Sequence, residues 1–206
     1  RIQPCSMKAA QRWTRSARCL ALGRCMTSRV FDRAPPIETE RLRLRAHAAA
    51  DFAACIPLWN DPVVTRFIGG RAYTPEEVWQ RLQRYAGSWV LLGHGFWAVE
   101  EKINAKLIGE IGIMDAKRDI DPPFGNDLEL GWALLPEAHG KGYASEALKA
   151  VLGWELQVLA SPCLVALIDP DNAPSIRLAN KFDFFFFFRS VYRGVPSIQF
   201  ERRRAT

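Results

Sequence analysis

The sequence predicts an α+β domain in which helices flank a mixed, mostly antiparallel sheet. Short runs rich in β-branched and aromatic residues alternate with longer amphipathic runs. Short runs such as residues 38–47 show the two-residue period of strands, and the longer runs show the 3.6-residue period of helices. The chain has 206 residues, of which 49% are hydrophobic, enough for a full core. We expect about seven strands and about four helices in one domain of residues 37–206, preceded by a basic extension over residues 1–36.

The domain is expected to open with a strand and two helices. Residues 38–47, ETERLRLRAH, alternate leucine with arginine, which is typical of a strand with one face in water. Asp51 is placed to cap a helix over residues 52–61. A second helix, over residues 74–90, begins with Thr74, a proline and, three residues after the threonine, a glutamate, which is the pattern of a capping box.

Three strands and a long helix are expected in the middle of the chain. Residues 95–101 and 106–116 are β-rich and are separated by KINA, which predicts a hairpin turn. Residues 126–135 form the next predicted strand. Apolar residues then recur at three- and four-residue spacing over residues 144–159, which predicts an amphipathic helix of about four turns.

The C-terminal part predicts three more strands and one more helix. Residues 162–168, PCLVALI, show no alternation, as expected of a strand covered on both faces. A helix over residues 172–182 follows, and residues 184–204 predict two strands joined around Arg193-Gly194. Within them, the run Phe184–Phe188 is interpreted as a central buried strand, because an exposed run of this kind favours aggregation.

The positive charge of the chain is confined to its N-terminal extension. Of the formal charge of +6, residues 1–33 hold eight bases and one acid, whereas residues 34–206 hold 20 bases and 21 acids. The domain is therefore near neutral, and no nucleic-acid partner is expected. The extension is expected to be disordered in isolation. It resembles a transit peptide in composition, but an upstream region wrongly joined to a start at Met26 and a nucleic-acid- or membrane-binding arm stay open.

The cysteines favour a reducing compartment, so the protein is expected in the cytoplasm. Cys5, Cys19 and Cys25 lie in the extension, and Cys55 and Cys163 are far apart, with no metal-ligand spacing. Neither a disulfide framework nor a metal is therefore expected. No stretch reaches 18 apolar residues, so no membrane span is expected.

A glycine loop precedes the long helix. In HGKG, Gly140 and Gly142 would allow close approach of the backbone to a ligand, Lys141 adds a cation, and a helix N-terminus offers free N–H groups to an anion. Neither the dinucleotide fingerprint nor the nucleotide P-loop is present. A phosphate seat and a simple flexible loop both remain open from these residues alone.

The neighbouring motifs resemble those of the GNAT superfamily of N-acetyltransferases, in particular its branch of ribosomal-protein alanine N-acetyltransferases. The resemblance runs from about Ile37 to the C-terminus. Its motifs are IETERLRLR, the FWAV and LIGEIGI strand pair, LELGWALLPEAHGKGYASEAL and ALIDPDNAPSIRLANKF. It implies transfer of an acetyl group from acetyl-CoA to an amine, and a strand at 126–135 that is splayed from the strand CLVALI to admit the cofactor.

The resemblance also implies the cofactor-binding residues. The family pattern of Arg or Gln, two residues, Gly, one residue and Gly or Ala falls on His139, Gly142 and Ala144, and His139 departs from it. The full set is Ala133, Leu134, Leu135, His139, Gly140, Lys141, Gly142, Tyr143, Ala144, Asn172 and Ser175. Without the resemblance, His139 would be a solvated loop residue, and Asn172 and Ser175 would be helix caps.

By the same resemblance, Glu129 is the candidate base, Ser175 the donor of a proton to the departing thiolate, and Tyr192 a proton donor or a wall of the acceptor site. The alternative for Glu129 is a sheet carboxylate paired with an arginine. No cysteine lies beside the loop, so direct transfer in a ternary complex is expected. The acceptor, a protein N-terminus or a small amine, stays open, and so does a homodimer.

Two further points follow from the resemblance. A non-catalytic acyl-CoA-binding module that has lost its proton-handling groups is the alternative from another class of protein. Asp183 stands where the family often has glycine after a helix, which predicts a left-handed residue at a cost of up to about 1 kcal/mol.

Overall fold

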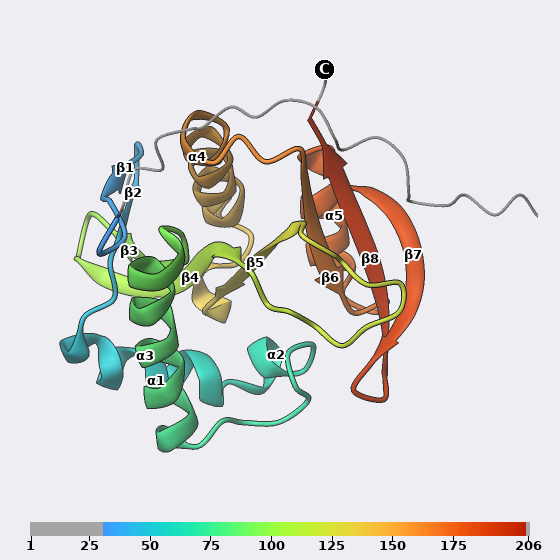
Figure 1. Cartoon of the computed structure of the whole chain (residues 1–206). Coiled ribbons are helices and arrows are strands. Elements are labelled where there is room, and N and C mark those ends of the chain that lie inside the picture. Colours follow the sequence, from blue (N-terminus) through green and yellow to red (C-terminus); the bar gives the residue numbers. More distant parts are fainter. Residues whose placement is uncertain (1–30, 205–206) are drawn as a thin grey trace, which may run out of the picture.

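The computed structural model describes residues 31–204, so the predictions for residues 1–30 lie outside it. One sheet contains eight strands in the order β1-β2-β3-β4-β5-β6-β8-β7, and its only parallel pair is β5 with β6 (Figure 1). The strands are β1 (Ile37–Glu38), β2 (Leu42–Arg45), β3 (Phe96–Glu101), β4 (Lys106–Met114), β5 (Leu128–Leu134), β6 (Cys163–Ile168), β7 (Phe185–Tyr192) and β8 (Val195–Arg203).

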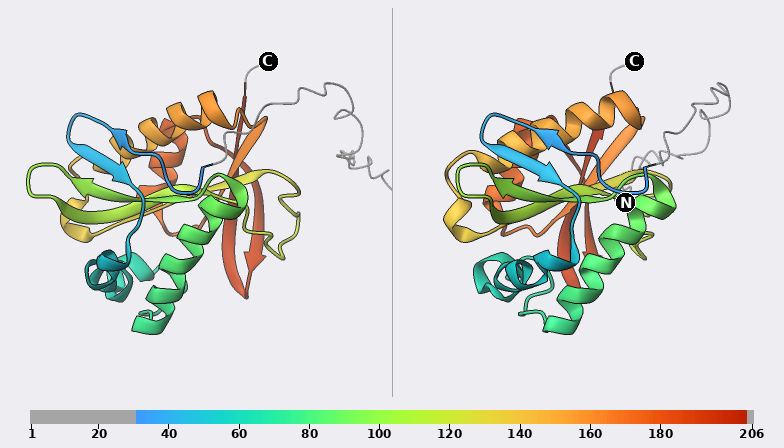
Figure 2. Two further views of the ribbon diagram at one scale, coloured as in Figure 1. Left: turned by 60° about the vertical axis from the view of Figure 1, so that its left-hand side comes forward. Right: turned by 90° about the vertical axis from the view of Figure 1, so that its left-hand side faces the viewer.

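Helices cover both faces of this sheet (Figure 2). They are α1 (Phe52–Asn60), α2 (Pro62–Thr65), α3 (Pro75–Leu92), α4 (Tyr143–Val158) and α5 (Ala173–Lys181). The predicted α+β class, with a mostly antiparallel sheet, is confirmed. The described residues contain one strand more than expected, because a turn divides the first predicted strand into β1 and β2, and one helix more, because α2 adds a single short helix.

Two apolar clusters fasten these layers to the sheet. On one face, residues of β4 and β5 such as Ile111 and Leu130 pack in a cluster with Leu148 and Val151 of α4. On the other face, Trp59 of α1 and Leu82 of α3 join a separate cluster that includes residues of β3, β4 and β5. The sheet is thus buried on both sides where β4 and β5 cross its centre.

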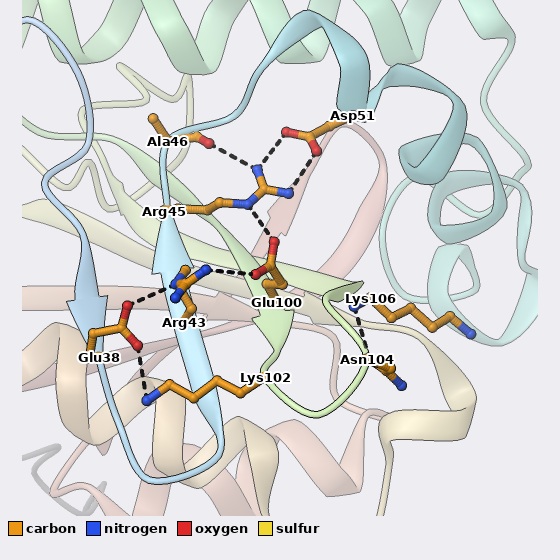
Figure 3. A network of polar contacts seen from close by, with 9 residues as sticks. All are labelled: Glu38, Arg43, Arg45, Ala46, Asp51, Glu100, Lys102, Asn104 and Lys106. Carbon is orange, nitrogen blue, oxygen red and sulfur yellow. Dashed lines mark hydrogen bonds and ion pairs between the residues drawn. The ribbon is translucent and has the colours of Figure 1, made fainter.

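One predicted cap is confirmed and one is wrong. The Glu77 N–H donates to Thr74 Oγ1 at 3.2 Å and the Thr74 N–H donates to Glu77 Oε2 at 2.8 Å, which is the predicted capping box of α3. Asp51 makes no side-chain cap with α1. Its carboxylate instead accepts from Arg45 Nη1 and Nη2, each at 2.8 Å (Figure 3), and from the Ala48 N–H at 2.7 Å. Asp51 already has helical backbone angles, at the end of a 3-10 turn, whereas an N-cap residue is extended.

The placement predicted for the phenylalanine run is also wrong. Phe184 is fully buried before the strand begins, but β7 is the outermost strand, and Phe185, Phe186 and Phe188 are 64%, 58% and 46% exposed. The reason lies in the C-terminal hairpin. Because β8 pairs with β6 on one side and β7 on the other, β7 is left at the edge.

The residues just before β1 contact the domain. Phe31 lies edge-on to Trp89 with ring centroids 6.1 Å apart, and the Pro35 carbonyl accepts from Trp97 Nε1 at 2.8 Å. The boundary between the extension and the domain at residue 37 therefore remains a proposal.

Within residues 31–204, no helix combines the length and the apolar character that crossing a membrane requires.

Replacement of Asp183 by glycine is expected to stabilise the protein. Asp183 follows α5 with a φ of +61°, and the next N–H, of Phe184, donates to the Ala179 carbonyl at 3.1 Å, which closes the helix end. Asp183→Gly should raise the free energy of unfolding in urea by up to about 1 kcal/mol, because glycine adopts this conformation without Cβ strain. Asp183→Ala is the control and should not stabilise. Equal stability of the glycine variant and the parent would contradict this account.

Candidate functional site

The strands β5 and β6 pair over only two residues and then separate. Their register joins Leu128 to Leu164 and Glu129 to Val165, and no pairing follows. On the other side, β5 stays paired with β4 along its length, and the Leu135 N–H donates to the Ile108 carbonyl at 2.8 Å. Since main-chain groups point alternately to the two sides of a strand, those of Leu130, Trp132 and Leu134 face the gap beside β6.

The glycine loop connects the open end of β5 to α4. A short 3-10 turn, Pro136–Ala138, leads into it, and Gly140 and Gly142 have φ values of +72° and +82°. Gly142 is the N-cap of α4, and its carbonyl accepts the first helical bond, from the Glu146 N–H at 3.1 Å. The N–H groups of Tyr143, Ala144 and Ser145 precede that bond and have no partner within the helix, so this end of α4 can receive an anion.

Helix α5 begins beyond the carboxyl end of β6 and joins both sides of the gap. The Asn172 side chain caps it, because Oδ1 accepts from the Ser175 N–H at 3.2 Å. The Ser175 hydroxyl accepts from Trp132 Nε1 of β5 at 3.2 Å. At the other end of α5, Lys181 Nζ lies 3.1 Å from the Ser145 hydroxyl in the first turn of α4. Because β5 and β6 are parallel, α4 and α5 both follow the carboxyl ends of these strands, where the strands diverge, and the C-terminal end of α5 lies beside the N-terminus of α4.

His139 turns back toward β5. Its Nε2 lies 2.9 Å from the Leu134 carbonyl, so Nε2 carries the hydrogen in this contact. The ring therefore contacts one of the main-chain groups that face the gap. The residue is nevertheless exposed, as a solvated loop histidine would be, so its part in the cofactor site stays a prediction.

The other residues expected to bind the cofactor lie at the same end of β5, with differing orientations. The side chains of Ala133, Leu134 and Leu135 are all buried. The main-chain groups of Ala133 and Leu135 point toward β4, so only Leu134 of these three presents them to the gap. Lys141 is exposed, and the buried Tyr143 hydrogen-bonds Glu101 through its hydroxyl.

Glu129 lies where the gap begins, and it is paired with an arginine. The carboxylate is 3% exposed; Arg118 Nη2 donates to its Oε1 at 2.6 Å, and Arg118 Nε donates to Oε2. Burial alone would lower the pKa of Arg118, but the hydrogen bond and charge of Glu129 outweigh burial and raise it. The guanidinium also lies 4.7 Å from the ring centroid of Tyr192. The structure thus brings Glu129 and Tyr192 together through Arg118. The ion pair itself is the one that the alternative interpretation of Glu129 expected.

A pocket of about 240 Å³ opens beside this group. It is lined by Glu129, Arg118 and the segment that connects β4 to β5, including Phe124 and Gly125. Its lining contains both charged side chains and apolar groups. Across residues 31–204, no three His, Cys, Asp or Glu side chains gather as a metal site would require.

Our sequence-based predictions missed a second buried carboxylate near β5. Glu110 of β4 faces Ala133 in the register and is 1% exposed. It accepts from the Tyr85 hydroxyl and from Trp59 Nε1 at 3.3 Å, and burial and this carboxylate raise the pKa of Tyr85. An acid in the otherwise apolar run LIGEIGI was the available signal, because a buried charge needs partners. Arg118, in the polar run AKRD, carried no such signal.

Comparison with known proteins assigns the family. Residues 41–184 match the model of the acetyltransferase (GNAT) domain. This chain therefore belongs to the GNAT acetyltransferase family, in agreement with the motifs at the glycine loop and at the start of α5.

Several relatives share most of this domain. YkkB of Bacillus subtilis is 31% identical over 147 residues, which cover 69% of this chain and 81% of that protein. The uncharacterized N-acetyltransferase p20 of Bacillus licheniformis is 29% identical over 147 residues, 71% of this chain and 80% of that protein. Among solved structures, an acetyltransferase from Agrobacterium tumefaciens is 28% identical, with a TM-score of 0.71 over 83% of this chain and 95% of its own.

A more distant structure shares the fold. The ribosomal-protein-S5-alanine acetyltransferase from Vibrio fischeri is 20% identical, with a TM-score of 0.68 over 82% of this chain and 97% of its own. At this identity the likeness concerns the fold alone.

Removal of Arg118 is expected to destabilise the protein strongly. Arg118→Ala leaves the Glu129 carboxylate buried without its partner, so the free energy of unfolding in urea should fall by about 3–5 kcal/mol. The neighbouring Lys117, whose side chain is exposed and pairs with Asp115, supplies the control, and Lys117→Ala should change it by less than about 1 kcal/mol. The double variant Arg118→Leu/Glu129→Leu should recover much of the loss. Similar small effects of both alanine variants would contradict the buried pair.

Proposed function

We propose that this protein is an acetyl-CoA-dependent N-acetyltransferase that moves the acetyl group to a primary amine by direct attack in a ternary complex. One observation carries the proposal: β5 and β6 part immediately after Glu129, and the N-termini of α4 and α5 both lie at the open end. This arrangement supplies an anion seat, a line of main-chain groups and a carboxylate along one path.

The cofactor would extend from the loop into the gap. Its diphosphate would be received by main-chain N–H groups of residues 139–144, where two left-handed glycines leave the backbone accessible. The pantetheine arm would lie along the gap-facing groups of Trp132 and Leu134, as an added strand does. An N–H on this edge would polarise the thioester carbonyl and stabilise the oxyanion that forms on attack. Asn172 and Ser175 would contact the cofactor from α5.

The acceptor amine has to be neutral when it attacks. As the new C–N bond forms, the amine loses a proton to Glu129, through water because Arg118 holds both carboxylate oxygens. Collapse of the tetrahedral intermediate breaks the C–S bond, and the thiolate takes a proton from the Ser175 hydroxyl, which recovers a proton from water. That hydroxyl accepts from Trp132 and keeps its own hydrogen to donate. Tyr192 would form part of the acceptor wall or donate a proton.

Direct transfer is favoured over a thiol intermediate. Cys55 is buried, and burial raises the pKa of its thiol to about 12, so it is not a nucleophile at neutral pH. Cys163 is likewise buried, in β6. Two buried cysteine residues also agree with the reducing cytoplasm that we propose as the location.

A second candidate is a non-catalytic acyl-CoA-binding module. The ion pair between Arg118 and Glu129 favours it, because it ties up the carboxylate that would act as the base. The two candidates share the cofactor site and differ only in turnover.

The acceptor and the turnover can be tested together. Thiol release from acetyl-CoA should be accelerated by at least one member of a panel of small amines and peptides. The panel includes peptides that begin with alanine, since alanine is the residue in the name of the Vibrio fischeri protein. Glu129→Gln should reduce kcat about 10²-fold or more if the carboxylate takes the proton. Binding of coenzyme A without acceleration by any amine would favour the binding module.

The cofactor seat can be tested without an acceptor. Gly142→Trp places a bulky side chain at the N-cap of α4 in a left-handed conformation, so acetyl-CoA affinity measured by calorimetry should fall about 10-fold or more through loss of the anion seat. Gly70→Trp is the matched control, since Gly70 has a φ of +70° and open space around it but lies outside the loop. Unchanged affinity in Gly142→Trp would overturn the assignment of the loop.

A further inference from the structure

The turn between β1 and β2 docks on the glycine loop through one arginine. We infer that Arg41 is a positioning residue for the diphosphate seat: it holds the Glu146 carboxylate away from the bound anion and fixes the path of the loop at Lys141. This inference rests on the proposed function, because it deepens the account of the cofactor site.

Glu146 is an unexpected neighbour for a diphosphate. It lies in the first turn of α4, where a negative charge would repel a second anion at the same helix end. Its side chain is 16% exposed and turns toward the β1–β2 turn. Oε1 accepts from the Thr39 hydroxyl at 2.6 Å and from the Arg41 N–H at 2.8 Å.

Arg41 completes the shell around this carboxylate. Its Nε and Nη2 both lie 2.7 Å from Oε2, so one oxygen faces the guanidinium and the other faces the turn. Burial tends to raise the pKa of Glu146, but these hydrogen bonds outweigh it and lower the pKa. The carboxylate therefore stays ionised and fully paired, and its charge is compensated locally.

The same guanidinium reaches the loop. Arg41 Nη1 donates to the Lys141 carbonyl at 2.9 Å, midway between the two left-handed glycines. The guanidinium lies 4.6 Å from the ring centroid of Tyr143, the first residue of α4. A Cβ at Gly142 would lie 3.4 Å from Nη2. Arg41 thus contacts the loop, the N-cap and the first turn of α4 at once.

Lysine could not reproduce this arrangement. The carboxylate and the Lys141 carbonyl are engaged by different nitrogens of one planar group, whereas an ammonium is a single point charge on a flexible stem. Arg41→Lys should therefore restore charge compensation but not the loop geometry, and its affinity should lie between those of the parent and Arg41→Ala.

The test compares two acetyl donors. Acetyl-CoA carries the diphosphate and acetyl-pantetheine lacks it, so only the former uses the seat that Arg41 positions. Arg41→Ala should raise KM for acetyl-CoA about 10-fold or more, because a charge-assisted shell is lost, while kcat changes little and kcat/KM for acetyl-pantetheine is unchanged. Glu146→Gln removes the repelling charge, so the effect of Arg41→Ala should be smaller in that background.

Arg43→Ala is the matched control. Arg43 lies two residues further on, in β2, and pairs with Glu38 and Glu100, away from the loop (Figure 3). The Arg43→Ala variant should leave KM for both donors unchanged.

The outcomes separate this inference from the proposed function. If the parent protein binds acetyl-CoA and Arg41→Ala binds it equally well, the inference is wrong and the function stands. If Arg41→Ala impairs both donors alike, or only lowers the melting temperature, the residue is structural and the inference is wrong. If Arg41→Ala does not fold, KM values of Arg41→Lys and Glu146→Gln for acetyl-CoA and acetyl-pantetheine are compared in the same way and decide whether the inference holds. If the parent binds no coenzyme A by calorimetry, both the function and the inference fall.

Discussion

The separation of β5 from β6 after Glu129 is the constraint on which the rest of the candidate site depends. A continuous sheet would pair every main-chain group of β5, but here the groups of Leu130, Trp132 and Leu134 are turned to a gap. Helix α5 holds this gap in shape, because it is linked to β5 by Trp132 and Ser175 and to the first turn of α4 by Lys181. The strand edge and both helix ends are therefore fixed relative to one another.

Three carboxylates around this region each lie beside an arginine from a different segment of the chain. Glu129 of β5 pairs with Arg118, which precedes that strand, and Glu146 of α4 pairs with Arg41. Glu110 of β4 lies 3.9 Å from Arg81 of α3. Removing two charges from water costs free energy, and their mutual attraction offsets this cost only in part, so such pairs add little net stability. Their main effect is to define how the elements are arranged. They fix where negative charge lies beside a site that has to accept an anion.

Much of the fold could be predicted from local patterns, since the period of apolar residues reports directly on secondary structure. The hairpin of β3 and β4, the helix α4 and the capping box at Thr74 were found in this way. The cap expected at Asp51 and the central strand expected at Phe184–Phe188 were wrong, because Arg45 and the Ala48 N–H bind the carboxylate and because strand order is a long-range property. The roles of the site residues came from motif resemblance and stay proposals.

The sequence by itself determined most of the elements, the glycine loop before α4 and the family motifs, because these depend on neighbours within a few residues. Only the tertiary structure decided that Arg118 binds Glu129, that Arg41 binds Glu146 across more than 100 residues of chain, and that β7 lies at the sheet edge. These contacts join side chains from separate elements, so their existence depends on how strands and helices pack and not on any local pattern.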